Sequence, residues 1–190
     1  MKYALFLQGI NIGGNRRLPM DDLKKCLEGL GFLAVRTYIQ SGNAVFEAGR
    51  PDTGAGAATD IAGIEAAVES ALLALAGFPV TCVARTEPEL SELVQKMPFP
   101  GCDEGRLCVT FLKTRPDAAD AEAFSALDLS PERFVLSGRE IYILCAAGFS
   151  DSRVTNSLVN KRLKIVSTNR NWRTVRRVLA MAAANAPQGG

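Results

Sequence analysis

The 190-residue sequence contains no histidine and no Cys-x-x-Cys pair. The absence of histidine excludes Ser-His and Cys-His nucleophile pairs and histidine-based zinc sites. General acid–base chemistry would therefore depend on carboxylates, lysine, tyrosine or cysteine. We expect neither a metal nor a cofactor, and most of the cysteines lie in apolar patterns typical of buried, reduced thiols. The five cysteines are Cys26, Cys82, Cys102, Cys108 and Cys145.

Long apolar runs are also absent. Apolar and glycine stretches such as 71–78 are far below the roughly 18 residues that a membrane span needs. The apolar run near the N-terminus is too short for the core of a signal peptide. We therefore expect a cytoplasmic protein without a membrane partner. The composition, 47% hydrophobic and 22% charged, is that of an ordinary globular chain with one domain or two small ones.

Acidic residues are missing from the last part of the chain. From Ser152 to Gly190 there are eight basic residues and no acidic one, which leaves 14 basic and 20 acidic residues before them. A basic segment on an acidic body indicates either an anionic ligand or an internal salt-bridged interface. The charge pattern is compatible with both interpretations.

The first half of the chain predicts the order β-α-β-β-α-β, which is the split βαβ or ferredoxin-like motif. Its first strand is a wholly apolar run, Tyr3 to Leu7, which is typical of a central strand buried on both faces. The following elements are a helix from about Pro19 to Gly31, strands at 35–40 and 44–47, a helix at 61–75 and a strand at 79–84. The segment at 48–59 has no apolar periodicity and is predicted to be a mobile loop.

The second half nearly repeats this order. Its expected elements are a helix at 88–95, a linker at 97–101, a strand at 107–112, a helix at 117–127, a hairpin of 133–136 with 140–145, and helices at 156–163 and 171–184. This order predicts a second ferredoxin-like unit whose final strand is replaced by a helix. No sequence repeat supports the duplication, which depends on element order alone.

The fold class is therefore predicted to be α+β, with two ferredoxin-like subdomains packed into one compact body. The predicted boundaries are 1–97 for the first subdomain, 98–184 for the second with its C-terminal helix, and 185–190 for a disordered tail. The oligomeric state cannot be predicted from these patterns.

Two polar loops of the first subdomain form one candidate site. In a ferredoxin-like unit the end of strand one and the turn between strands two and three lie at the same edge of the sheet. The loops would bring together Gln8, Asn11, Gly13 and Gly14 with Gln40, Ser41 and Asn43. Turn formation alone explains the glycines and asparagines, but glutamine is not a turn-forming residue. A ligand site and a purely structural turn therefore stay as alternatives.

The segment Thr168–Thr174 is the second candidate site. Asn169 or Asn171 can cap the last helix, and Trp172 is expected to anchor that helix in the core. The first two turns of this helix, where the helix dipole disfavours cations, are then expected to hold four arginines: Arg170, Arg173, Arg176 and Arg177. Their partners would be an anionic ligand or carboxylates of the acidic body.

Three motifs, at 3–14, 35–43 and 168–175, together resemble those of the DUF1697 family of bacterial proteins. The resemblance follows the chain in order over its whole length. It implies an α+β fold with ferredoxin-like subdomains and no established biochemical activity. The family usually has arginine where this chain has Gln8. If that arginine binds a ligand in the family, the departure implies weaker binding here or the use of Arg16, Arg17 or Arg170 instead.

We interpret the chain as a binding module for a phosphorylated small molecule or nucleic acid, with no catalytic residue assigned. The candidate ligand-binding residues are Gln8, Asn11, Gly13, Gly14, Gln40, Ser41, Asn43, Arg170, Asn171 and Arg173. The alternatives are an enzyme acting on a small anionic substrate and a structural or assembly protein. An RNA-recognition domain is disfavoured, because the third strand offers only Phe46 and lacks the aromatic and basic signature.

Overall fold

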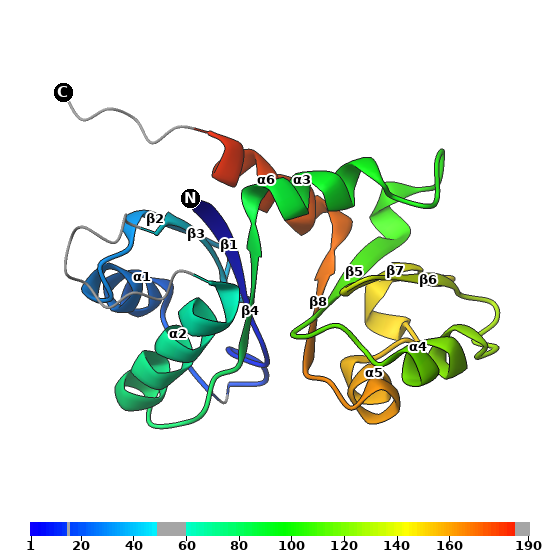
Figure 1. The fold of residues 1–190 in the computed structure, drawn as a ribbon, viewed down its shortest axis with the longest axis horizontal. Helices are drawn as coiled ribbons and strands as arrows, with labels where there is room; N and C mark the ends of the chain where they lie inside the picture. The colour runs from blue at the N-terminus through cyan, green and yellow to red at the C-terminus, as the bar shows by residue number, and fades with distance from the viewer. Residues whose placement is uncertain (15, 49–59, 185–190) are drawn as a thin grey trace. The chain divides into compact units, whose positions relative to one another are not determined.

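The computed structural model describes residues 1–14, 16–48 and 60–184. Within these residues the chain is α+β, with two four-stranded antiparallel sheets and six α-helices (Figure 1). The predicted fold class, with two ferredoxin-like units, is confirmed. Beyond Ala48, the loop predicted to be mobile lies outside the described residues, and so does the predicted tail at 185–190.

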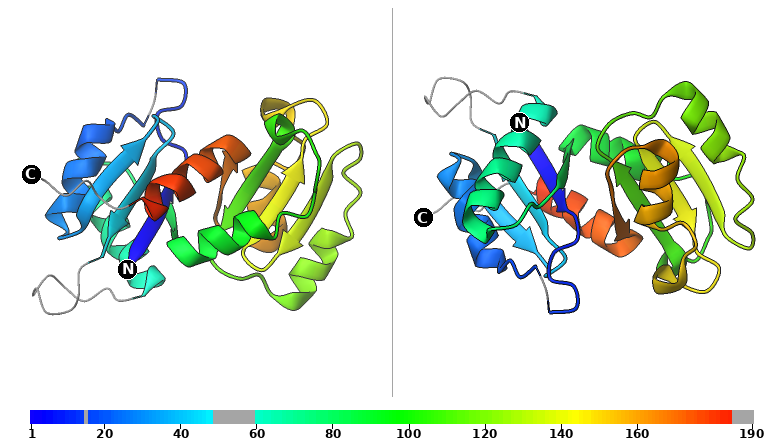
Figure 2. Two further views of the ribbon diagram at one scale, coloured as in Figure 1. Left: turned by 90° about the horizontal axis from the view of Figure 1, so that it is seen from above. Right: turned by 90° about the horizontal axis from the view of Figure 1, so that it is seen from below.

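The first sheet has the strand order β2-β3-β1-β4, and helices α1 and α2 cover one of its faces (Figures 1 and 2). Every pairing in it is antiparallel, and β1 is paired on both edges. The prediction of a central first strand is therefore confirmed. The elements are β1 (Lys2–Leu7), α1 (Met20–Gly29), β2 (Leu33–Tyr38), β3 (Asn43–Glu47), α2 (Ile61–Ala76) and β4 (Cys82–Thr86).

The core of the first unit lies between this sheet and its two helices. Leu5 and Leu7 project from β1 into a cluster with residues at helical spacing on α1 and α2. Because side chains alternate along a strand, Ala4 and Phe6 face the opposite side, and they too are fully buried. The helical members of the cluster are Leu23, Leu27, Ile64, Val68 and Leu72.

Strand β4 lies at the edge of the first sheet, and two glutamates of α2 cover its unpaired backbone. The Cys82 N–H donates to Glu69 Oε1 at 3.0 Å, and the Ala84 N–H donates to Glu65 Oε1 at 2.7 Å. Glu65 and Glu69 are one helical turn apart, so their carboxylates match alternate residues of the strand. They occupy donors that a further strand would otherwise use, which protects the edge from pairing with another chain.

The second sheet has the order β6-β7-β5-β8, and α4 and α5 cover one of its faces (Figure 1). Its core cluster includes Cys108, Ile143 and Cys145 from the sheet, with Phe124 from α4 and Val159 from α5. The elements from β4 onward are α3 (Glu87–Gln95), the 3₁₀ turn η2 (Glu104–Arg106), β5 (Leu107–Leu112), α4 (Ala118–Ser125), β6 (Arg133–Ser137), β7 (Glu140–Leu144), the 3₁₀ turn η3 (Phe149–Asp151), α5 (Asn156–Leu163), β8 (Ser167–Asn171) and α6 (Trp172–Ala183).

Strand β8 corrects the prediction that a helix replaces the last strand of the second unit. Ser167–Asn171 pairs antiparallel with β5 from Leu112↔Ser167 to Cys108↔Asn171. The segment reads Ser-Thr-Asn-Arg-Asn, which has low strand propensity and no apolar alternation. Pairing with the buried strand β5 outweighs that propensity, because the backbone groups of a central strand need partners on both sides.

The contacts divide the chain into residues 1–91 with 178–190 as one unit and 92–177 as the other. These bounds differ from the predicted 1–97 and 98–184, mainly in the second half of α6. Lys2 Nζ donates to the carbonyls of Ala183 and Ala184, and the Arg36 guanidinium donates to those of Met181 and Ala184. These cations satisfy free carbonyls at the negative end of α6, which attaches this segment to the first unit.

Gly42 occupies a position where no side chain fits. Its φ is +78°, and a Cβ there would lie 2.7 Å from Ile10 Cδ1 and 2.8 Å from Leu7 Cβ. We predict that Gly42→Ala lowers the free energy of unfolding by about 2–4 kcal/mol, through backbone strain and overpacking. Urea denaturation of the purified protein measures the change.

Gly14 is the matched control, because its φ is also +78° but a Cβ there meets nothing within 4 Å. Gly14→Ala therefore carries the strain alone and is expected to cost about 1 kcal/mol. Equal losses for the two variants would show that packing around Gly42 has no effect.

The edge glutamates give a second prediction for stability. Glu65→Leu leaves the buried Ala84 N–H without its acceptor and is expected to lower the free energy of unfolding by about 1–3 kcal/mol. Glu65→Gln keeps an oxygen acceptor of the same reach and should lose less. If Glu65→Leu is as stable as the wild type in urea denaturation, the hydrogen bond does not support the edge strand.

Candidate functional site

The two loops predicted to meet in the first unit do so in the structure. Asn11 Nδ2 donates to the Gln40 carbonyl at 2.8 Å, and the Leu7 N–H donates to the Gly42 carbonyl at 2.8 Å. The end of β1 and the turn after β2 therefore share one edge of the sheet, as the ferredoxin-like strand order requires. Gly13 and Gly14 lie in the same first loop with positive φ.

The asparagine amides at this edge are used inside the protein. Asn11 accepts from the Leu18 N–H at 2.8 Å and donates to the Leu18 carbonyl at 2.9 Å, in addition to its bond to Gln40. Asn43 is fully buried and donates to the Tyr38 carbonyl at 2.9 Å and to Ser41 Oγ at 3.1 Å. These bonds favour the structural interpretation of both residues, and their role toward a ligand stays a prediction.

Arg16, one of two arginines in the first loop, also has partners inside the protein. The Arg16 guanidinium lies 5.3 Å from the centre of the Phe78 ring and donates to the Pro79 carbonyl. This cation–π contact and hydrogen bond attach the loop to the segment before β4. Gln8 is half-buried and Gln40 is exposed, and neither side chain has a hydrogen-bond partner among the described residues.

Arg170 lies in strand β8, not in the first turn of the last helix as predicted. It is only 7% exposed, and its NH1 donates to Thr168 Oγ1 at 2.8 Å and to the Asn169 carbonyl at 2.7 Å. Burial lowers the pKa of Arg170 to about 10, so the guanidinium keeps its charge at neutral pH. The expectation that cations crowd the first two turns of the helix therefore holds for Arg173, Arg176 and Arg177 but not for Arg170.

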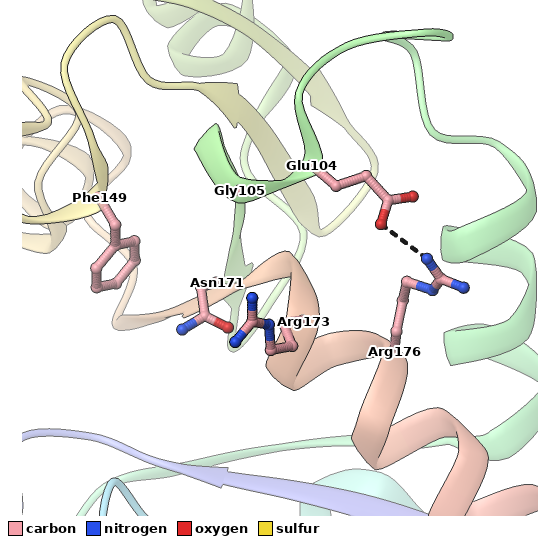
Figure 3. Close-up of a pocket in the computed structure, with 6 residues that line it drawn as sticks. All are labelled: Glu104, Gly105, Phe149, Asn171, Arg173 and Arg176. Carbon is pink, nitrogen blue, oxygen red and sulfur yellow. Dashed lines mark hydrogen bonds and ion pairs between the residues drawn. The ribbon is translucent and has the colours of Figure 1, made fainter.

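Asn171 and Arg173 do line a common cavity, of about 490 Å³, in the second unit (Figure 3). Asn171 ends β8, and Arg173 lies in the first turn of α6. The other walls of the cavity come from the turn η2, with Glu104 and Gly105, and from the turn η3, with Phe149. The six lining residues are Glu104, Gly105, Phe149, Asn171, Arg173 and Arg176.

Asn171 forms the start of helix α6. Its Oδ1 accepts a hydrogen bond from the Thr174 N–H at 2.8 Å, which is the bond of an N-cap residue. The predicted capping role is confirmed, and Trp172, at 2% exposure, is buried as the expected core anchor. The amide nitrogen of Asn171 has no partner among the described residues, so this donor is left for the cavity.

The two arginines of the cavity differ in their partners. Arg176 NH1 lies 2.7 Å from Glu104 Oε2, and both side chains are more than half exposed, so the pair adds about 0–1 kcal/mol to stability. Arg173 has no hydrogen-bond or ion-pair partner in the described part of the chain. Figure 3 shows its guanidinium beside the Asn171 side chain.

Sequence reasoning missed Glu104, Gly105 and Phe149 as members of this site, and it placed Arg176 at the helix start without naming it as a ligand-binding residue. Arg176 could have been found, because residues three apart on a helix share one face and Arg173 was already a candidate. Glu104 and Phe149 come from turns distant in sequence, and no motif connects them with α6. Their place at the cavity depends on the pairing of β8 with β5, which the sequence did not predict.

Two further findings concern the described residues as a whole. No three histidine, cysteine, aspartate or glutamate side chains among them lie close enough to hold a metal ion. None of their helices has the length and apolar character needed to cross a bilayer.

The chain is thus an α+β protein with two ferredoxin-like units. The second unit carries a cavity lined by arginines at the start of helix α6. The family model described as "Protein of unknown function (DUF1697)" matches residues 1–142, and the chain belongs to this family. No curated protein matches the sequence.

A solved structure has the same fold over nearly the whole chain. It is the conserved bacterial protein SP0830 from Streptococcus pneumoniae, with a TM-score of 0.73 and 22% sequence identity. The superposition covers 95% of this chain and 98% of that chain. At this identity the similarity establishes the fold, including the part of the chain beyond residue 142.

The cap of α6 gives a test of the local geometry. Asn171→Ala removes the acceptor of the Thr174 N–H, and we predict a loss of about 1 kcal/mol in the free energy of unfolding. Asn171→Asp keeps an oxygen at the same place and should retain the stability of the wild type. Equal melting temperatures for the alanine and aspartate variants would contradict the capping role.

Proposed function

We propose that the protein binds a phosphorylated small molecule in the cavity of its second unit. The observation that carries this proposal is Arg173, a guanidinium that lines the cavity and has no partner among the described residues. A guanidinium presents paired N–H donors that match phosphate oxygens. An exposed arginine that lines a cavity and has no carboxylate partner among the described residues is therefore suited to an anionic ligand.

The position of Arg173 strengthens this argument. The start of the 12-residue helix α6 carries partial positive charge, and a cation in its first turn is unfavourable. A bound phosphate would interact favourably with the helix dipole and with Arg173 at the same time. The free amide nitrogen of Asn171 adds a neutral donor on the same side of the cavity.

The size and walls of the cavity suit a small molecule. A volume of about 490 Å³ lies within the range of small-ligand sites. Phe149, 41% exposed, provides an apolar surface across the cavity from Arg173 (Figure 3). Glu104 is paired with Arg176, so among the described residues the site has one cation without a partner, Arg173, and one paired cation. This favours a ligand with a single phosphate group.

A thermal-shift and calorimetry experiment tests the proposal with adenosine 5′-monophosphate and ribose 5-phosphate as probes. Adenosine and ribose are the unphosphorylated controls. We expect the phosphorylated probes to raise the melting temperature and Arg173→Gln to weaken their affinity at least tenfold, since a charged hydrogen bond contributes about 1.5–3 kcal/mol.

Arg177→Gln is the matched control, because Arg177 lies on the same helix and does not line the cavity. It removes the same charge and should leave the affinity within about twofold. Glu104→Gln frees Arg176 and is expected to tighten binding of the phosphorylated probes. The proposal fails if no phosphorylated probe shifts the wild type, or if Arg173→Gln and Arg177→Gln have the same effect.

Salt dependence separates a small ligand from nucleic acid. One phosphate contact predicts only a few-fold loss of affinity between 50 and 200 mM salt, whereas six to ten contacts predict a loss of about 10³–10⁵. Tight binding of a ten-nucleotide DNA with the steep slope, and no binding of the monophosphates, would favour the nucleic-acid alternative.

A further inference from the structure

A pair of buried thiols lies in the second unit, apart from the residues that line the cavity. Cys108 is in β5, and Cys145 directly follows the last residue of β7. Both are fully buried, and their Sγ atoms are 3.5 Å apart, which is direct contact between the two sulfurs. We propose that Cys108 and Cys145 are a redox modification site that a hydroperoxide converts to an intramolecular disulfide.

The strand register places the two sulfurs together. Cys108 pairs with Ile143, and the Cys145 N–H donates to the Arg106 carbonyl at 2.8 Å, so the cysteines are diagonal neighbours on one face of the sheet. Diagonal neighbours lie farther apart than most disulfide-bonded residues. A disulfide requires the sulfurs to approach to about 2.05 Å. Cys145 lies just beyond the last residue of β7, and Arg106 holds its backbone N–H and carbonyl, so disulfide formation requires a local shift of this segment.

The surroundings of Cys145 favour its thiolate form. The hydrogen bond from Cys108 lowers the pKa of Cys145, and the Ser152 hydroxyl and the Arg106 charge add to this effect, while burial and Glu132 oppose it. The same hydrogen bond, together with burial, raises the pKa of Cys108. Because Cys145 also lies just after the end of β7, whereas Cys108 lies inside β5, the proposal assigns Cys145 as the nucleophile and Cys108 as the resolving thiol.

The segment at 146–152, which follows Cys145, is where the oxidant would reach the buried thiols in this proposal. It is held at one end by Arg106, which donates to the carbonyls of Cys145 and Ala146, and at the other by Glu132, which accepts from the Ser152 hydroxyl and the Arg153 N–H. Between these attachments lies the partly exposed Phe149. Local opening of this short segment would uncover Cys145 without unfolding the sheet.

The chemistry balances with hydrogen peroxide as the oxidant. The Cys145 thiolate attacks one peroxide oxygen, the O–O bond breaks, and the leaving hydroxide takes a proton, which gives a sulfenic acid and water. The sulfur of Cys108 then attacks Cys145 Sγ and the S–O bond breaks. The departing hydroxide takes the Cys108 proton as a second water. Two thiols lose two electrons, and one peroxide is reduced to two waters.

The experiment treats the full chain with hydrogen peroxide, removes the excess with catalase, and alkylates the denatured protein with iodoacetamide. We expect the number of alkylated cysteines to fall from the five of the sequence by two, with Cys108 and Cys145 linked in the peptide map. Dithiothreitol should restore all of them. Between pH 6 and 8 the reaction should accelerate as pH rises, because the thiolate of Cys145 is the attacking species.

Cys108→Ser removes the resolving thiol and should leave a sulfenic acid on Cys145 that dimedone traps. Cys26→Ser is the matched control and should still lose two thiols. The wild-type peptide map decides the proposal even if Cys108→Ser does not fold. Disulfide formation by another pair overturns it, and so does oxidation of the partly exposed Cys26 and Cys102 while Cys108 and Cys145 stay fully alkylated.

Discussion

The pairing of a buried central strand on both of its edges is the constraint on which each unit depends. β1 and β5 are apolar strands inside the protein, and their backbone N–H and C=O groups have no water to bond to. Each therefore needs two neighbours, and the second neighbour is the last strand of its unit. The edge strands β4 and β8 and the helices that follow them take their positions from this requirement.

The requirement also explains why the duplication is hidden in the sequence. Strand β4 reads Cys-Val-Ala-Arg-Thr and β8 reads Ser-Thr-Asn-Arg-Asn, so the arginine at the fourth position is the only residue that they share at the same place. Both arginines are buried, and each donates through NH1 to the carbonyl of the residue before it, at 2.8 Å for Arg85 and 2.7 Å for Arg170. The two strands therefore share their position at the sheet edge beside the central strand and one buried arginine, and not their sequence.

Most of the fold could be predicted because local patterns and tertiary structure agree. The apolar run of β1, the helical spacing of α1 and α2 and the hairpin of β6 with β7 each indicate their own structure. β8 could not be predicted, because its polar sequence becomes a strand only through pairing with β5. The loops of the first unit meet as strand order predicted, but the sequence did not show that Asn11 and Asn43 would use their amides internally.

Part of the candidate site could also be predicted, where local sequence patterns were enough to identify its residues. Asn171 and Arg173 were identified because capping and helix-dipole arguments use only residues near in sequence. Arg170 was identified with them but misplaced, since its strand was not recognised. Glu104 and Phe149 could not be identified, because they reach the cavity from turns whose positions depend on the whole second sheet.

Helices α3 and α6 each follow the last strand of a sheet, but their first turns carry opposite charges. After β4, Thr86 and Glu89 bond to each other at the start of α3, and the first turn contains Glu87 and Glu89. These carboxylates interact favourably with the helix dipole inside the chain itself.

After β8, helix α6 has no acid in its first turn, and Arg173 adds positive charge there. The fold is the same at both places, so the difference comes from the side chains alone. The first turn of α3 contains carboxylates, whereas α6 begins with the neutral cap Asn171 and has no carboxylate in its first turn. Among the described residues Glu104 pairs with Arg176 and not with Arg173, which is why we propose the start of α6 beside Arg173 as the place for an anion.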